Sequence, residues 1–282
     1  MIAACTPLDT DDIWSVVKGE IKIQKVLPVI TVLTIAATGS EMDTSAIITN
    51  METNEKTGPA NAGMRPKITI MDPTYTFSVP QKQTAAGTAD IMSHAMEVYF
   101  NNIKGAFLQA RFAESVLKTC VKYGHVAYND PTNYEARANL MWASSWAING
   151  LCTKGAPVGW SCHAMEHELS AYYDIVHGVG LAILIPHWLR HMLREDNVWK
   201  YVEFGVNVWG IDPSLPEMEI ANKAIDATAQ YFIDMGLPTK LSEVGIDDSK
   251  FDIMAEKAGA GLKKAFVPMD ASDVKEIYTK AL

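Results

Sequence analysis

The chain is poor in cysteine, has no excess of positive charge and lacks a long apolar run. Its four cysteines (Cys5, Cys120, Cys152 and Cys162) form no CxxC pair, which favours a cytoplasmic protein with reduced thiols. No apolar run approaches the roughly 20 residues that a membrane span needs. The first residues also lack the basic region and long apolar stretch of a signal peptide. We therefore expect a cytoplasmic location and no membrane partner.

Charge excludes a second group of functions. The 282 residues carry a formal net charge of −9 at pH 7, which would repel a nucleic acid or an anionic lipid surface. Hydrophobic residues make up 48% of the chain and charged residues 20%, so a sizeable core is available and bulk disorder is not expected. The length fits one large or two ordinary domains.

The hydrophobic pattern changes near residue 80. Before it, the β-branched apolar run 26–37 ends in the turn Thr38-Gly39-Ser40, and 46–49 and 67–71 have the composition of short strands. The polar, turn-rich stretch 51–66 is expected to be exposed. The chain is thus predicted to join the C-terminal part of an α/β unit, residues 1–79, to an all-helical domain, residues 80–282. Helices are expected near 84–102, 106–128, 132–152, 160–173, 177–195, 217–235, 248–258 and 271–281.

The spacing of acidic and histidine residues predicts a metal site. Asp90 and His94 are four residues apart in one expected helix, and His163 and His167 repeat that spacing in another, so each pair shares a helix face. His177 follows at the start of a further helix. One carboxylate with two or three imidazoles suits Fe²⁺ or Zn²⁺ and does not choose between them. Spacing alone does not decide between His163 and His167.

A single pair of this kind is common by chance and usually marks a surface or a satisfied hydrogen bond, but two pairs with a third histidine are more specific. His187 and His191 form a rival pair four residues apart. No carboxylate lies close to them before Glu195, so we interpret them as helix-packing residues. Cys162 adjoins His163, and a buried thiol is the simpler interpretation of it.

Longer segments resemble the iron-type alcohol dehydrogenase family. TVLTIAATGSEMDTSAIIT is similar to the cofactor-side TTAGTGSE segment of that family, and RPKITIMDP resembles the strand that follows it. QKQTAAGTADIMSHAMEVYF resembles the GxDxxxH helix. SCHAMEHELSAYYDIVHGVGLAILIPHWLRH resembles the HxxxHxxGxxxxxxHG signature, with Ser170 where many members have Gly. The resemblance covers nearly the whole chain and is strongest to the NADP-linked butanol dehydrogenase branch.

The resemblance implies a ligand set and a catalytic residue. It assigns the divalent metal to Asp90, His94, His163 and His177. It places His167 beside the nicotinamide rather than on the metal, where it could relay the hydroxyl proton towards solvent. That role suits a pKa near neutrality.

The resemblance also makes residues 1–79 part of a dinucleotide-binding domain for NADP or NAD. It implies that Thr34, Thr38 and Ser40 line the dinucleotide and that Lys67 reaches its ribose or phosphate. Without it, Thr34 would be an ordinary strand residue and Lys67 a solvated edge lysine. The family carries a GGGS-type phosphate loop ahead of the matched residues, and the chain contains no GGGS, GxGxxG or GxxxxGK[ST]. We therefore expect an N-terminally short chain with weakened cofactor binding and with exposed strands that favour a homo-oligomer, such as a dimer.

The implied function is hydride transfer between NAD(P)(H) and a primary alcohol or aldehyde at a metal centre. Two alternatives remain at this point. His163-Ala-Met-Glu166-His167 also fits the HxxEH motif of zinc metallopeptidases, with Glu166 as general base, but this leaves Asp90, His94 and His177 without a role. The other alternative is a catalytically silent scaffold.

Overall fold

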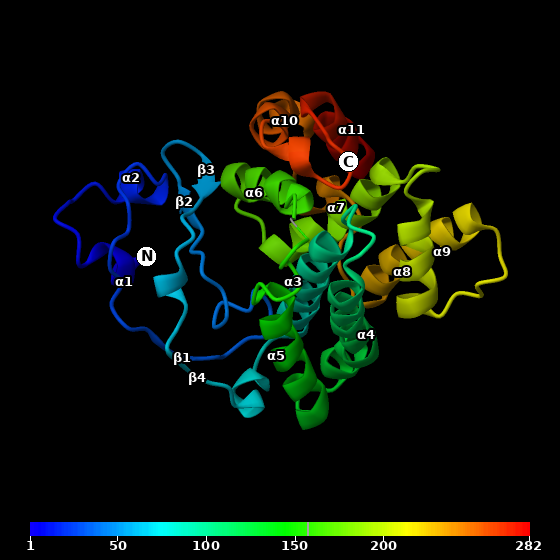
Figure 1. The fold of residues 1–282 in the computed structure, drawn as a ribbon, viewed down its shortest axis with the longest axis horizontal. Helices are drawn as coiled ribbons and strands as arrows, with labels where there is room; N and C mark the ends of the chain where they lie inside the picture. Colours follow the sequence, from blue (N-terminus) through cyan, green and yellow to red (C-terminus); the bar gives the residue numbers. More distant parts are fainter. Residues whose placement is uncertain (157) are drawn as a thin grey trace.

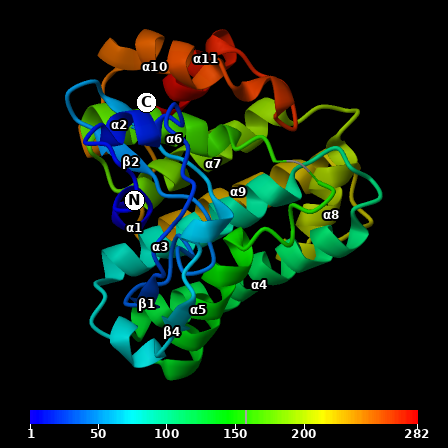
Figure 2. The same ribbon diagram turned by 60° about the vertical axis from the view of Figure 1, so that its left-hand side comes forward.

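The computed structural model describes residues 1–156 and 158–282, which form an N-terminal lobe, residues 1–79, beside a larger helical body, residues 80–282. Figure 1 shows the lobe in blue and cyan along one side of the body, and the turned view in Figure 2 shows it in front of α5 and α6. The lobe contains α1 (Ile2–Cys5), α2 (Ile13–Val17), β1 (Ile30–Val32), β2 (Ile48–Asn50), β3 (Glu55–Thr57) and β4 (Ile68–Ile70).

The helical body confirms the helices expected from the sequence, with bounds that differ by a few residues. It consists of α3 (Gln81–Tyr99), α4 (Phe107–Asn129), α5 (Tyr134–Ile148), α6 (Ser161–Tyr173), α7 (His177–Met192), α8 (Val198–Trp209), α9 (Glu217–Asp234), α10 (Phe251–Gly259) and α11 (Ala271–Ala281). The sequence did not predict α8. No helix within the described ranges combines the length and apolar character needed to cross a bilayer.

The strand pair β1–β4 is the parallel sheet of the lobe. Its register aligns Thr31 with Thr69, whose hydroxyl oxygens lie 2.9 Å apart. The predicted buried strand 26–37 is therefore wrong in length and in burial, because only Ile30–Val32 pairs. The partner β4 is three residues long, and the apolar side chains flanking the threonines on both strands are at least half exposed.

The stretch 51–66, expected to be an exposed loop, is only partly so. Residues 55–57 form β3, which pairs antiparallel with β2, Ile48 opposite Thr57 and Asn50 opposite Glu55. This β2–β3 hairpin lies against α6 (Figure 1). Through Lys56 the hairpin contacts the buried carboxylate of Glu166 on α6.

Helix α3 is the central element of the body. Every residue from Thr84 to Tyr99 is buried, and small residues such as Ala85, Ala86 and Gly87 line its first turns. They let neighbouring backbones come close. A Cβ added to Gly178, at the start of α7, would lie 2.0 Å from the carbonyl oxygen of Ala86. Glycine at position 178 therefore allows α7 to begin directly against α3.

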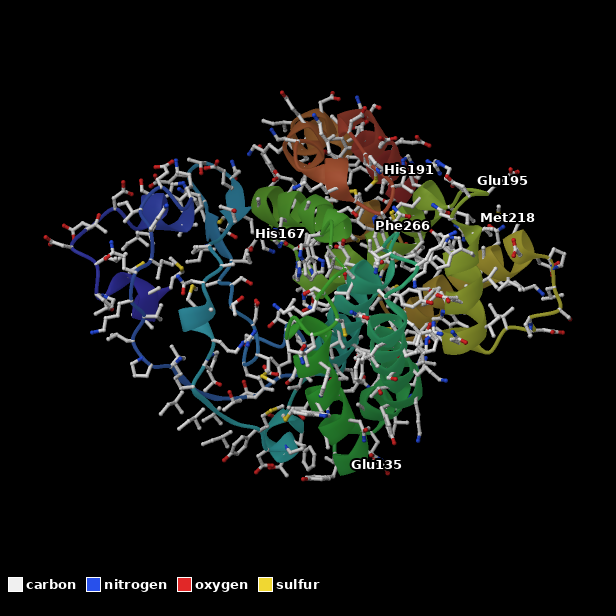
Figure 3. All side chains as sticks on the ribbon, viewed as in Figure 1. Glu135, His167, His191, Glu195, Met218 and Phe266 are labelled. Carbon is white, nitrogen blue, oxygen red and sulfur yellow. The ribbon has the colours of Figure 1, made fainter. Side chains whose placement is uncertain are left out.

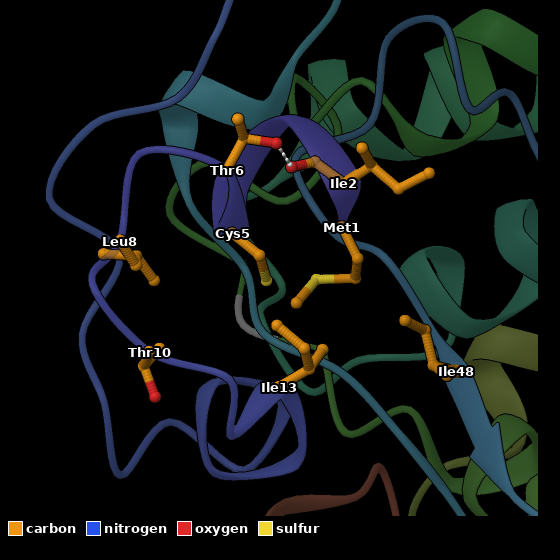
Figure 4. A pocket seen from close by; sticks show the side chains of 8 residues that line it. All are labelled: Met1, Ile2, Cys5, Thr6, Leu8, Thr10, Ile13 and Ile48. Carbon is orange, nitrogen blue, oxygen red and sulfur yellow. Dashed lines mark hydrogen bonds between the residues drawn. The ribbon is translucent and has the colours of Figure 1, made fainter.

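A cavity of about 490 Å³ lies in the lobe, away from the histidines. Figure 4 shows the side chains of α1, α2 and β2 around it. Its lining is mostly apolar, with Met1, Ile2, Cys5, Leu8 and Ile13 among the residues. Thr6, also in the lining, donates its hydroxyl to the Ile2 carbonyl at 2.8 Å. This lining offers no cluster of charged or metal-binding groups.

Candidate metal centre

Polar residues on buried α3 mark the site. Ser93 and His94 follow Asp90 by three and four residues, and Glu97 follows His94 by three. These four residues therefore share one face of the buried part of α3. Buried carboxylates and imidazoles are costly unless they are paired or bind a metal. A polar stripe in the core therefore indicates a functional site rather than a packing role.

Three imidazoles surround one oxygen of Asp90. Asp90 Oδ1 lies 3.7 Å from His177 Nε2, 3.9 Å from His163 Nε2 and 3.8 Å from His94 Nδ1. These separations are too long for hydrogen bonds. They are close to the roughly 3.4 Å expected between ligand atoms that share a tetrahedral ion at about 2.1 Å. These separations suit donor atoms that would share one ion.

Buried polar atoms without hydrogen-bond partners also indicate a site for a cation. Among the residues that the structure describes, Asp90 Oδ1, His163 Nε2 and His94 Nδ1 are buried without a hydrogen-bond partner. An unsatisfied buried polar atom costs about 1–3 kcal/mol, and three of them lie together. A divalent cation would satisfy all three, so the donor set fits the metal that the sequence predicts.

The predicted ligands are not equally well gathered. Asp90, His163 and His177 offer ligand atoms that all lie within 4.8 Å of one another. His94 borders this group, with its ring stacked on that of His163 at a centroid distance of 4.6 Å. It is outside the mutual 4.8 Å set in the structure as it stands.

Burial and neighbouring charges act differently on the pKa values of His163, His167 and His177. Burial lowers the pKa of His163 far below its ordinary value, helped by the charges of His94 and His177. Burial also lowers the pKa of His167, to about 2, with contributions from His163 and Lys56. Burial opposes charge on His177 too, but its hydrogen bond to Glu166 and the charge of that carboxylate leave its pKa raised.

His167 therefore differs from expectation. It lies near His177, with ring centroids 5.6 Å apart, but its pKa is far from neutrality because burial and neighbouring cationic groups disfavour the imidazolium. His167 stays neutral throughout the ordinary pH range. Figure 3 shows it on the side of the helical body that faces the N-terminal lobe.

Two carboxylates that the sequence did not assign to the metal site contact its imidazoles. Glu97 Oε1 lies 2.8 Å from His163 Nδ1 and accepts the His163 backbone N–H at 2.8 Å. Glu166 Oε2 contacts His177 Nδ1. Burial raises the pKa of Glu97 to about 7, against the backbone N–H groups of α6 that lower it. The spacing of Glu97 from Asp90 and His94 on one helix face was the signal that could have found it.

The surroundings of Glu166 do not suit the general-base role that it would have in a metallopeptidase. Its side chain is 0% exposed, and its oxygens contact His177, the Ser170 hydroxyl at 2.5 Å and Lys56 Nζ at 3.5 Å. A fully buried carboxylate with these partners lacks the open side that a general base acting on water needs. The HxxEH interpretation further needs His163 and His167 on one ion, but the clusters formed by the described residues put these two histidines in different groups.

The cofactor-side residues lie on the lobe side of the site. Thr34, Thr38 and Ser40 are exposed and follow β1, and Lys67 is exposed at the start of β4. The segment 34–40 packs on the helical body: a Cβ at Gly87 would lie 2.5 Å from the Ala36 carbonyl oxygen. Gly87 is one helical turn before the first metal-ligand candidate on α3.

Lys56, on β3, is the lysine that reaches the histidine cluster. Its side chain is 15% exposed, and its Nζ lies 3.5 Å from Glu166 Oε2. The sequence did not indicate it, because the polar, turn-rich stretch 51–66 predicts an exposed loop. The lysine that the sequence favoured is Lys67. Among the described residues it forms no salt bridge or side-chain hydrogen bond with the histidine cluster.

The rival histidine His191 contacts a carboxylate on another helix. His191 Nε2 lies 3.0 Å from an Asp273 carboxylate oxygen and so ties α7 to α11. Figure 3 shows His191 away from the side where His167 lies. Cys162 is a buried thiol, and burial raises its pKa well above the ordinary value.

The fold and the site define a metal-dependent oxidoreductase with its ligand residues in a helical body and an α/β lobe beside them. Comparison with known proteins agrees. Residues 84–282 match the family model "Fe-containing alcohol dehydrogenase family, C-terminal", and residues 1–73 match "Iron-containing alcohol dehydrogenase". The chain belongs to the iron-containing alcohol dehydrogenase family. Its members interconvert alcohols and aldehydes with a divalent metal and NAD(P)(H), and nothing supports a metallopeptidase.

Individual relatives point the same way. The chain is 56% identical to NADH-dependent butanol dehydrogenase B of Clostridium acetobutylicum, covering 100% of this chain and 73% of that protein. It is 35% identical to an NADPH-dependent aldehyde reductase of Escherichia coli, over 90% of this chain and 66% of the relative. The crystal structure of NADH-dependent butanol dehydrogenase A from Thermotoga maritima superposes with a TM-score of 0.91 at 34% identity, covering 99% of this chain and 72% of that one.

Proposed function

We propose that Asp90, His163 and His177, completed by His94, hold one divalent metal at which this chain interconverts a primary alcohol and an aldehyde. The observation that carries the proposal is the cluster around Asp90 Oδ1, which has imidazole nitrogens at 3.7–3.9 Å and no hydrogen-bond partner among the described residues. The carboxylate and imidazole donors suit Fe²⁺ or Zn²⁺.

The metal, the nicotinamide and the residues of the protein would each supply a different part of the chemistry. When bound, the metal supplies a Lewis acid for the substrate oxygen. The nicotinamide supplies or accepts the hydride. The protein's own residues hold the reacting groups and exclude water: α3, α6 and α7 are packed around the cluster, and Asp90 and His163 are buried.

His167 is the residue we assign to proton handling. A neutral imidazole carries one N–H and one lone pair, so it can accept a proton at one nitrogen while it releases another. The low pKa of about 2 keeps it in that form. Its position beside His177, on the lobe side of the body, fits a role between substrate and solvent.

We assign cofactor binding to the face of the lobe that meets the body, with Thr34, Thr38, Ser40 and Lys67 as contacts. The segment 34–40 supports this because it packs on α3 one turn before Asp90. The domain boundary is proposed at residues 79 and 80, since Pro80 is the residue before α3 begins. The choice between NADH and NADPH is open to experiment, since relatives of both kinds occur.

The substrate is proposed to be a short primary alcohol or its aldehyde, because two relatives are named butanol dehydrogenases and a third an aldehyde reductase. A cytoplasmic location fits the four buried cysteines. We also propose a homodimer, supported by the apolar side chains of Ile30, Val32, Ile68 and Ile70, which are 50–64% exposed on β1 and β4.

The test is reduction of butanal by the purified chain with NADH and, separately, with NADPH, alongside metal analysis. We expect one Fe²⁺ or Zn²⁺ per chain and oxidation of one of the two cofactors in step with aldehyde loss. A chain that holds its metal but turns over neither cofactor would be the silent scaffold. A chain that reduces butanal without any metal would overturn the assignment of the cluster.

A further inference from the structure

Two buried glutamates contact the far nitrogens of the proposed metal ligands. Glu97 on α3 lies 2.8 Å from His163 Nδ1, and Glu166 on α6 contacts His177 Nδ1. In both histidines the other nitrogen, Nε2, faces Asp90 Oδ1, at 3.9 and 3.7 Å. The same arrangement therefore occurs twice, on different helices, around one oxygen.

The chemistry of the pair fixes the form of each imidazole. When its carboxyl is ionised, each glutamate only accepts hydrogen bonds, so the imidazole nitrogen that it contacts carries the proton. In a neutral imidazole the other nitrogen is then left with its lone pair. Contact at Nδ1 thus presents an Nε2 lone pair to the space beside Asp90, which is the form that a metal needs.

Each glutamate is itself held in place. Glu166 is fixed by the Ser170 hydroxyl at 2.5 Å and by Lys56 Nζ at 3.5 Å. Glu97 accepts the backbone N–H of His163 at 2.8 Å, and so caps the start of α6, where the residue before the helix provides no side-chain cap. Both carboxylates are 3% exposed or less. Groups held this firmly restrict the rotation of the imidazoles that they contact.

We propose that Glu97 and Glu166 are positioning residues that set the tautomer and orientation of His163 and His177 for metal binding. This inference rests on the proposed metal site. It adds that metal affinity depends on two residues that do not touch the metal. Because Lys56 belongs to the β2–β3 hairpin, the contact of Glu166 with Lys56 also links the N-terminal lobe to the ligand His177.

The experiment measures Co²⁺ affinity by competition with a chelator, together with the visible absorption of bound Co²⁺. Glu166→Gln removes the charge but nearly preserves the volume, and Glu97→Gln does the same at the second position. Loss of such partners typically weakens metal binding 10–100-fold. We expect that loss in each variant, with a changed Co²⁺ spectrum, and partial recovery of affinity in Glu166→Asp.

Glu168→Gln is the matched control. Glu168 is on the same helix and partly buried, but its pKa is set by burial, Lys257 and Glu55, and no imidazole is among these influences. The Co²⁺ affinity of the Glu168→Gln variant should stay within twofold of that of the parent chain. If Glu166→Gln and Glu97→Gln, shown to be folded by circular dichroism, bind Co²⁺ with the parent affinity and spectrum, the positioning role is wrong and the metal site stands. If the parent chain binds no Co²⁺, the metal site fails and this inference with it.

Discussion

Asp90 is the residue on which the site depends, because its Oδ1 lies between imidazole nitrogens from three helices. A lone buried carboxylate would be strongly destabilising, and the neighbouring imidazoles form no hydrogen bond with Asp90 Oδ1. The arrangement becomes favourable when a cation occupies the space between these groups. Substitution of a single residue of this cluster should therefore lower the metal content before it disturbs the fold.

The ligand histidines give the first prediction. His163→Ala and His177→Ala should each weaken metal binding by more than about 100-fold, beyond the usual effect of losing an outer partner. His187→Ala should retain the metal, because His187 is outside the cluster. Metal analysis after dialysis checks all three. The reverse pattern, with metal lost only from the His187 variant, would mean that the wrong histidines were chosen.

The pKa of His167 gives the second prediction. Because burial holds that pKa at about 2 against an ordinary 6.5, the imidazole is neutral in the folded protein from pH 5.5 to 9. His167→Ala should therefore keep its metal and lower kcat by roughly 100-fold or more, by a similar factor at every pH in this range. A pH–rate profile of both proteins measures this. A defect confined to pH below 6.5 would instead indicate an imidazole that titrates near neutrality.

At the residue scale, the sequence could predict only part of the site. The two i, i+4 pairs predict the helix faces that carry Asp90 and His163, because helical spacing is local. The sequence could not show that His163 faces Asp90 whereas His167 groups with Glu166, since that depends on how α6 is rotated against α3. Lys56 was not foreseen for a similar reason: its contact with Glu166 spans 110 positions in the chain.

At the scale of elements, close packing of α7 on α3 brings His177 to the site. A Cβ on Gly178 would lie 2.0 Å from the Ala86 carbonyl oxygen and 2.6 Å from its carbon, both backbone atoms. The first turn of α7 could accept a larger residue only by moving away from α3. His177 adjoins Gly178 and would move with it.

Gly178→Ala is the third prediction. Overpacking of this kind costs about 1–3 kcal/mol, so we expect Tm to fall by several degrees and metal affinity to fall with it. Gly105→Ala is the control, since a Cβ there meets no atom within 4 Å. Calorimetry and metal competition are the measurements. A Gly178→Ala chain as stable and as metal-replete as the control would show that the close approach is not needed.

The elements themselves were predictable to different degrees. Long helices such as α3 and α6 follow from their spacing and few breaks. Helix α8 was missed because VWKYVEFGVNVW is rich in β-branched and aromatic residues and contains Gly205, although its buried positions recur at helical intervals. The strand expected over 26–37 shrank to Ile30–Val32 because strand length depends on the partner, and β4 is short.

On the scale of the whole molecule, the lobe and the helical body meet at the proposed metal site. The β2–β3 hairpin brings Lys56 to α6, and the segment 34–40 packs on α3. On β1 and β4, apolar side chains are exposed to solvent. An exposed apolar strand pair favours pairing with another chain.

Self-association through these strands is the fourth prediction. Val32 and Ile70 are paired in register and each 50% exposed, so Val32→Lys combined with Ile70→Lys should disfavour the contact without removing core side chains. Light scattering should give a dimer for the parent chain and a monomer for this variant. Met51→Lys, at a 65% exposed position in the turn between β2 and β3, should remain dimeric. A variant with the parent mass would exclude these strands as the interface.

The most direct test of the account is anomalous diffraction from crystals of the chain grown with Zn²⁺, recorded on both sides of the zinc absorption edge. We predict one strong peak per chain, about 2.0–2.2 Å from a carboxylate oxygen of Asp90 and from one nitrogen each of His94, His163 and His177. A peak between His163 and His167 that leaves Asp90 uncoordinated, or no peak within reach of Asp90, would contradict it.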